Sequence, residues 1–255
     1  MPSLLLAICA ALVAGGALLA TAATSPTHLA APAVAADTGD KAAFGRKIRD
    51  FLVANPEVLV EAMQEFERRQ DSQRDSVAQK AISQHKAELF SDPEAPSGGN
   101  AGGDVVVVDF NDYQCPYCKR AHLALKSVAA ADGKVKVVYK DLPILGEPSR
   151  IAALAALASV KQGKHQALHN ALMEFSGKLD RDRILEIAAS VGLDVALLQK
   201  DMEDPKFKQL IERNMALAGA LGVRGTPAFV IGDQFVPGAI DADALKQLIA
   251  EARKR

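Results

Sequence analysis

Two of the three cysteines in this chain are separated by only two residues, as Cys115-Pro116-Tyr117-Cys118. A disulfide between such close neighbours closes too small a loop to stabilise a fold, which favours chemistry over structure. Residues 105–110 form a β-branched run typical of a buried strand, and a helical pattern follows the cysteines. Cys115 is therefore predicted at a helix N-cap, where free N–H groups and the helix dipole stabilise a thiolate.

This placement predicts different roles for the two sulfurs. The Cys115 thiolate is expected to attack a disulfide near neutral pH. Cys118 lies one turn inside the helix and is less accessible, so we expect it to attack the resulting mixed disulfide and release the substrate. Pro116 suits the first helical turn, because no N–H is needed there.

Metal binding is the main alternative for two cysteines at this spacing. A zinc half-site needs two further ligands, and the chain has no second cysteine pair. His122, His165 and His169 are more typical of core or surface positions. A protein that holds copper through the CxxC remains an alternative class: it would form a 1:1 complex that survives a chelator, whereas exchange gives a trappable mixed disulfide. We predict no metal site and no cofactor.

A second element lies at residues 225–230, which read Gly-Thr-Pro-Ala-Phe-Val. A proline at the start of a buried strand removes a ladder donor and therefore needs a reason. A cis peptide bond before Pro227 would supply one.

The order of elements after residue 104 is strand, helix, strand, a long helical stretch over about 148–222, a hairpin and a last helix. With the CxxC and the Gly-Thr-Pro loop, this order resembles the thioredoxin fold of the DsbA-like family over about residues 87–255. The predicted fold class is therefore α/β, thioredoxin-like with a helical insertion, preceded by an N-terminal helical extension. The turn-rich residues 91–104 are either a linker or a loop inside this domain.

The resemblance also implies roles for individual residues. In the family the cis-proline loop faces the CxxC, and the residue before the proline pairs with the substrate backbone as an added strand; this implies substrate binding by Thr226 and Pro227. A family acid lies beneath the cysteines, and Asp109 occupies that place, with an ordinary strand-end acid as the alternative. Tyr117 beside the cysteines is expected either to form an apolar rim for clients or simply to pack.

The N-terminal residues 1–36 are predicted to be a signal peptide. Residues 4–23 carry no charge, and small residues with Ala-x-Ala sites follow. An uncleaved membrane anchor is the alternative, since twenty residues can span a bilayer. The expected location of the protein is the periplasm.

Residues 37–86 are predicted to be a helical, oligomerising segment. Six of its residues follow a 4-3-4-3-4 spacing typical of a heptad seam: Leu59, Met63, Phe66, Gln70, Gln73 and Val77. A helix packed on its own domain is the alternative. The segment resembles that of ScsC-type proteins, copper-tolerance relatives of DsbA, some of which trimerise and shuffle disulfides.

These patterns predict a periplasmic thiol–disulfide oxidoreductase. Thr226 before the proline is similar to the isomerase and reductase members DsbC and DsbG, which favours those activities; a monomeric DsbA-type oxidase is the alternative. Expected partners are exported client proteins with cysteines, a membrane reductant or oxidant, and further copies of the chain in a trimer. With 30 Lys and Arg against 31 Asp and Glu, no basic excess favours nucleic acid.

Overall fold

A computed structural model describes residues 38–254 of the chain. The predicted signal peptide, residues 1–36, lies outside them. The described residues fall into two compact units that divide after Leu59. Within residues 38–254, no helix has the length and apolarity needed to cross a bilayer.

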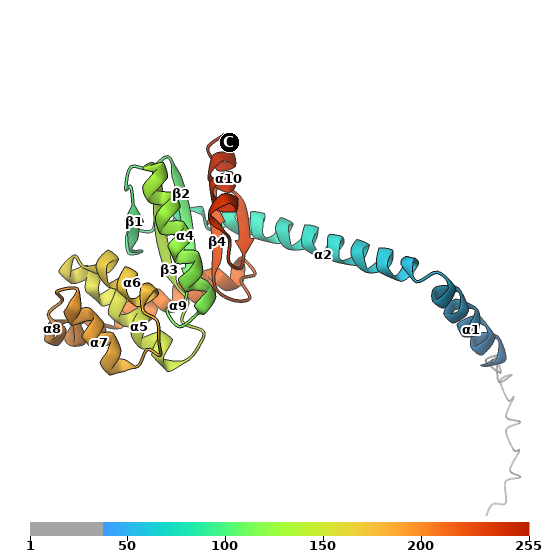
Figure 1. The fold of residues 1–255 in the computed structure, drawn as a ribbon, viewed down its shortest axis with the longest axis horizontal. Coiled ribbons are helices and arrows are strands. Elements are labelled where there is room, and N and C mark those ends of the chain that lie inside the picture. The colour runs from blue at the N-terminus through green and yellow to red at the C-terminus, as the bar shows by residue number, and fades with distance from the viewer. Residues whose placement is uncertain (1–37, 255) are drawn as a thin grey trace, which may run out of the picture. The chain divides into compact units, whose positions relative to one another are not determined.

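The centre of the second unit is a five-stranded sheet with strand order β1-β3-β2-β4-β5. Its strands are β1 (Ser97–Gly99), β2 (Val105–Asn111), β3 (Val135–Asp141), β4 (Ala228–Ile231) and β5 (Gln234–Pro237). Only β2 and β3 run parallel, and the other neighbouring pairs are antiparallel. This mixed sheet, flanked by helices, confirms the predicted thioredoxin-like α/β class (Figure 1).

The two faces of the sheet pack on different helices because side chains alternate along each strand. Val105 and Val107 of β2 face α4 (Pro116–Asp132) and α10 (Ala242–Ala252) in one buried cluster. Residues at the alternate positions of the strands pack instead against the end of α2 (Glu57–Gln84), against α3 (Lys86–Phe90) and against α9 (Pro205–Ala220). Asp109 belongs to the first register, so it points to the face that α4 covers.

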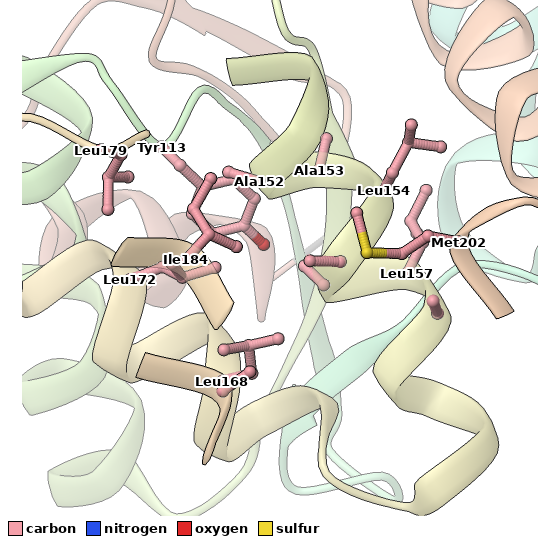
Figure 2. Packing of buried hydrophobic residues seen from close by; sticks show 14 of the residues in the cluster. Tyr113, Ala152, Ala153, Leu154, Leu157, Leu168, Leu172, Leu179, Ile184 and Met202 are labelled. Carbon is pink, nitrogen blue, oxygen red and sulfur yellow. The ribbon is translucent and has the colours of Figure 1, made fainter. Parts of the chain in front are cut away.

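The predicted helical insertion is present as a cluster of short helices between β3 and β4. They are α5 (Glu147–Ala158), the 3-10 helix η1 (Ser159–Gln162), α6 (His165–Glu174), α7 (Arg181–Ser190), α8 (Val195–Met202) and α9 (Pro205–Ala220). Their core includes Tyr113, Cys115 and Cys118, so the insertion packs directly on the CxxC. Figure 2 shows Tyr113 among the leucines and alanines of this core.

The turn-rich residues 91–104 are a loop of the domain and not a linker. They contain β1, which pairs with β3 and which the sequence analysis did not predict. Asp92 of the same loop accepts from the buried Lys140 amine at 2.7 Å. Gly99 has φ +68°, and a Cβ there would overlap the Val135 carbonyl oxygen, which explains a glycine in this strand. Because glycine is depleted in strands, the sequence Ser-Gly-Gly did not indicate that β1 is a strand.

The N-terminal part forms α1 (Thr38–Ala54) and α2 (Glu57–Gln84), as the helical pattern predicts. Along α2 only Ala78, Ala81 and Ile82 are buried. The apolar residues of the predicted seam, which are Leu59, Met63, Phe66 and Val77, are 51–62% exposed in the single chain. Burial on the chain's own domain therefore begins only at the last two turns of α2.

Candidate active site

The first turn of α4 holds the CxxC in the predicted geometry. Cys115 is the N-cap with extended backbone angles, φ −75° and ψ 117°, and Pro116 occupies the first turn. The Cys118 N–H donates to Cys115 Sγ at 3.4 Å, so the sulfur itself caps the helix. Both cysteines are free thiols and both are buried. The predicted N-cap is confirmed.

The Gly-Thr-Pro loop lies against the Cys115 sulfur. The Thr226–Pro227 peptide bond is cis, as the sequence analysis expected. The Cys115 thiol donates to the Thr226 carbonyl oxygen at 3.2 Å. The antiparallel pairing of β2 with β4, in which Phe110 is opposite Ala228, brings this loop to the end of β2 where α4 begins.

Cys118 lies in a more enclosed position than its partner. The Asp112 backbone N–H donates to Cys118 Sγ at 3.5 Å. Burial raises the pKa of the Cys118 thiol far above its ordinary value, and the nearby Asp109 and Cys115 charges add to the rise. Hydrogen bonds from the Thr226 side chain and the Asp112 amide oppose it in part. Cys118 therefore needs a base before it can act as a nucleophile.

Two buried carboxyls lie on the α4 face of the sheet. Burial raises the pKa of Asp109 to about 8, and the charge of Asp141 contributes. Burial likewise raises the pKa of Asp141 to about 7, opposed by Tyr113 and Asn111. Asp141 ends β3, whereas Asp109 lies two residues before the end of the neighbouring β2, opposite Tyr139. Asp141 was missed by the sequence analysis, although a charged residue ending a buried strand was a visible signal.

The three histidines of this region are core residues. The Tyr113 hydroxyl and His169 Nδ1 lie 2.9 Å apart, and the rings of His122 and His165 lie 5.1 and 5.7 Å from that of His169. Burial lowers the pKa of all three, that of His165 to about 4. Nowhere in residues 38–254 are three His, Cys, Asp or Glu side chains arranged to hold a metal ion.

The two tyrosines next to the CxxC lie in different surroundings. Tyr113 is buried, whereas Tyr117 is 56% exposed and stacks under the Arg120 guanidinium at 4.5 Å. A groove of about 1060 Å³ runs along the cis-proline loop. Its walls include Thr226, Pro227 and Phe66 of α2. The groove shares Thr226 with the contact to Cys115 Sγ.

Comparisons with known proteins agree with this geometry. Residues 91–251 match a family model described as thioredoxin, and residues 40–73 match the N-terminal domain of copper resistance protein ScsC. A thioredoxin-like oxidoreductase from Silicibacter pomeroyi DSS-3 is 49% identical, with a TM-score of 0.65 over 67% of this chain and 98% of that one.

Two further solved structures extend the likeness. The thiol–disulfide exchange protein alpha-DsbA2 of Wolbachia pipientis is 35% identical, with a TM-score of 0.65 over 70% of this chain and 97% of that one. ScsC of Proteus mirabilis in a transitional conformation is 31% identical, with a TM-score of 0.64 over 85% and 98%.

A curated relative places the same domain in another context. The match to a Na⁺/H⁺ antiporter of Salinispora arenicola is 27% identical over 58% of this chain, which spans only 23% of the antiporter's length. That likeness is confined to a part of the longer protein. The matches over most of both chains are to redox proteins, and the chain belongs to the thioredoxin family as a DsbA-like thiol–disulfide oxidoreductase of the ScsC type.

Proposed function

We propose that this protein is a periplasmic disulfide isomerase or reductase that works as a trimer on exported client proteins. The observation that carries the chemistry is the Cys115 sulfur, which caps α4 and faces the Thr226 carbonyl at 3.2 Å. This position combines a helix N-terminus, which favours a thiolate, with a backbone edge on which a client strand can pair.

The exchange begins when the Cys115 thiolate attacks a client disulfide. One Cys115–client S–S bond forms, the client S–S bond breaks, and the second client sulfur leaves as a thiolate. In isomerisation a client thiolate attacks the mixed disulfide, which restores Cys115 and leaves a rearranged client bond. In reduction the Cys118 thiolate attacks Cys115 Sγ instead, forms the Cys115–Cys118 disulfide and expels the client thiolate.

The resolving step requires that Cys118 lose a proton. Asp109 is the proposed acceptor, since its carboxyl lies on the face of β2 covered by α4 and its pKa is about 8. A carboxyl that titrates near neutral pH can both accept the Cys118 proton and return it. Asp141 beside it, with a pKa of about 7, can share that proton.

The exposed apolar residues of α2 are the argument for a trimer. Phe66, Met63 and Val77 expose half or more of their surface in one chain, and a second and third copy of the same helix would cover them. The match of residues 40–73 to the ScsC N-terminal model supports the same assignment. Several CxxC sites then surround one client, which raises the effective concentration of attacking thiolates. A membrane reductant is implied, because Cys115 must be kept reduced.

The decisive experiment compares the mature chain with a variant that begins at Ser76, which removes most of the seam but keeps the buried residues Ala78, Ala81 and Ile82 of α2. We expect light scattering to give a trimer for the mature chain and a monomer for the truncated one. Refolding of a scrambled multi-disulfide substrate should fall with truncation, while oxidation of a simple dithiol persists or rises. A mature chain that is already monomeric would favour a DsbA-type oxidase.

A further inference from the structure

Asp112 has no part in the mechanism above, yet it makes contacts that no other residue of the site combines. It lies in the turn between β2 and α4 and is 1% exposed. Its Oδ1 accepts from the Gln114 N–H at 2.8 Å. Its Oδ2 accepts from the N–H groups of Ile144 and Leu145 at 2.9 and 3.0 Å. One carboxylate therefore satisfies three backbone donors.

The main chain of the same residue contacts both cysteines. The Asp112 N–H donates to Cys118 Sγ at 3.5 Å, and its carbonyl accepts from the Cys115 N–H at 3.0 Å. The side chain thus holds a distant loop while the backbone holds the redox pair. A shift of the peptide unit at Asp112 therefore changes the contacts of the loop and those of the two cysteines together.

The loop in question follows β3 and precedes α5, and we name residues 142–146 the Asp112 loop. Its start is fixed by the Leu142 N–H, which donates to the Asn111 carbonyl at 2.8 Å. Beyond that point the Leu145 N–H donates to Asp112, and the Ile144 N–H is shared between Asp112 and the Leu142 carbonyl at 2.9 Å. The side chains of Ile144 and Leu145 are 43% and 52% exposed. The loop therefore presents two exposed apolar side chains from a backbone that the Asp112 carboxylate helps to order.

We propose that Asp112 is a positioning residue that couples the redox state of the Cys115–Cys118 pair to the Asp112 loop. In the dithiol form Cys118 Sγ accepts the Asp112 N–H. When the Cys118 thiolate attacks the mixed disulfide, its electron pair becomes the bond to Cys115 Sγ and the client thiolate departs. The Cys118 sulfur is then bonded to Cys115 Sγ at about 2.05 Å, which draws it away from the Asp112 N–H and weakens a hydrogen bond that is already 3.5 Å long.

When the hydrogen bond from the Asp112 N–H to Cys118 Sγ weakens, the Asp112 peptide unit can shift. The hydrogen bonds from the Ile144 and Leu145 N–H groups to the Asp112 carboxylate then weaken as well. The dithiol form holds the apolar loop in place for a client, and the disulfide form relaxes it when the client leaves. Because the contacts are strongest in the dithiol form, Asp112 stabilises that form relative to the disulfide. This inference rests on the proposed function, since it takes the two cysteines as the exchanging pair.

The substitution Asp112→Asn tests the coupling with the smallest change in shape. Its amide keeps one acceptor oxygen but turns an N–H₂ toward amide donors, so either Gln114 or the Asp112 loop loses its partner. We expect the equilibrium constant for reduction by glutathione to fall by about tenfold, the size of one lost hydrogen bond to a charged group. Asp194→Asn, which weakens an exposed carboxylate that accepts from the Leu197 N–H, is the matched control and should leave the constant unchanged.

Amide hydrogen exchange of the wild-type chain tests the same coupling without a substitution. We expect the Leu145 amide to be protected in the dithiol form and to exchange several-fold faster in the disulfide form. The Ile144 amide, which also donates to the Leu142 carbonyl at 2.9 Å, should change in the same direction by less. Equal protection of both amides in the two redox forms would overturn the proposal, as would an unchanged glutathione constant in a folded Asp112→Asn variant. Failure of the proposed function looks different: wild-type protein would not exchange with glutathione at all.

Discussion

Helices α2 and α4 carry the clearest patterns in the sequence, yet they end in opposite surroundings. The first turn of α4 is enclosed by the sheet, the cis-proline loop and the helical insertion, and both cysteine sulfurs have defined partners. Most of α2 is bare, with Phe66 exposed by 62%. The comparison shows that the spacing of apolar residues predicts which face of a helix is buried. It does not predict whether the same chain or another copy buries that face.

The largest expected effect concerns the enclosed helix. Cys115→Ala should abolish exchange, and Cys118→Ala should instead accumulate mixed disulfides with clients, because the second sulfur can no longer resolve them. Non-reducing electrophoresis after addition of a client with disulfides measures both. Equal trapping by the two variants would contradict the assignment of Cys115 as attacking thiol.

The exposed helix provides the next test. Phe66→Glu places a charge in the proposed seam and should reduce the solution mass about threefold, from trimer to monomer, because like charges would meet at the helix interface. Gln64→Glu introduces the same charge at an exposed position outside the seam and should leave the mass unchanged. Light scattering separates the outcomes, and a trimer in both variants would remove Phe66 from the interface.

Asp109 tests whether the enclosure of α4 serves proton transfer. Asp109→Asn should slow release of client from the mixed disulfide by about 10²-fold, the usual contribution of a general base. In the wild type, release should accelerate as pH passes the Asp109 pKa of about 8, because the carboxylate can then accept the Cys118 proton. Stopped-flow measurement of release against pH should show that this rise is lost in the variant.

The same substitution should change the pH dependence of stability. The folded-state pKa of Asp109 lies above its ordinary value of 3.8, so its protonated form stabilises the fold at low pH. That contribution is lost as pH rises through about 8. The free energy of unfolding of Asp109→Asn, relative to that of the wild type, should therefore rise between pH 5 and pH 9. The rise should be at least about 1.4 kcal/mol, which corresponds to one pKa unit. Urea unfolding at the two pH values measures it, and parallel curves would contradict the buried carboxyl.

The smallest expected effect is at Thr226. Its side chain lowers the Cys118 pKa through a hydrogen bond, so Thr226→Val removes a group that favours the dithiol form. The reduction potential should become more negative by about 30 mV. For a two-electron couple this shift corresponds to about a tenfold change in the equilibrium constant. Thr226→Ser keeps the hydroxyl and should keep the potential. Equilibration with glutathione measures both variants.

Sequence patterns predicted the parts of this molecule that depend on local geometry. The N-cap at Cys115, the strands around it and the cis bond at Pro227 all follow from residue types within a few positions. The arrangement of Asp141, Asp112 and His169 around the cysteines does not, because it arises where β3, the Asp112 loop and α6 meet in space. Strand β1 was missed for a different reason, since the shape of its neighbours demands glycine there.

The two active-site cysteines and the helical insertion share one core, in which Cys118, Leu172 and Ile184 belong to the same buried cluster. Local opening of the insertion would therefore uncover a sulfur that is otherwise 2% exposed. The rate of Cys118 alkylation in a Cys115→Ala variant measures that opening, because the rate is proportional to the fraction of molecules in which the insertion is open. In this fold the reactivity of Cys118 Sγ therefore reports both the active-site chemistry and the local opening of the helical insertion.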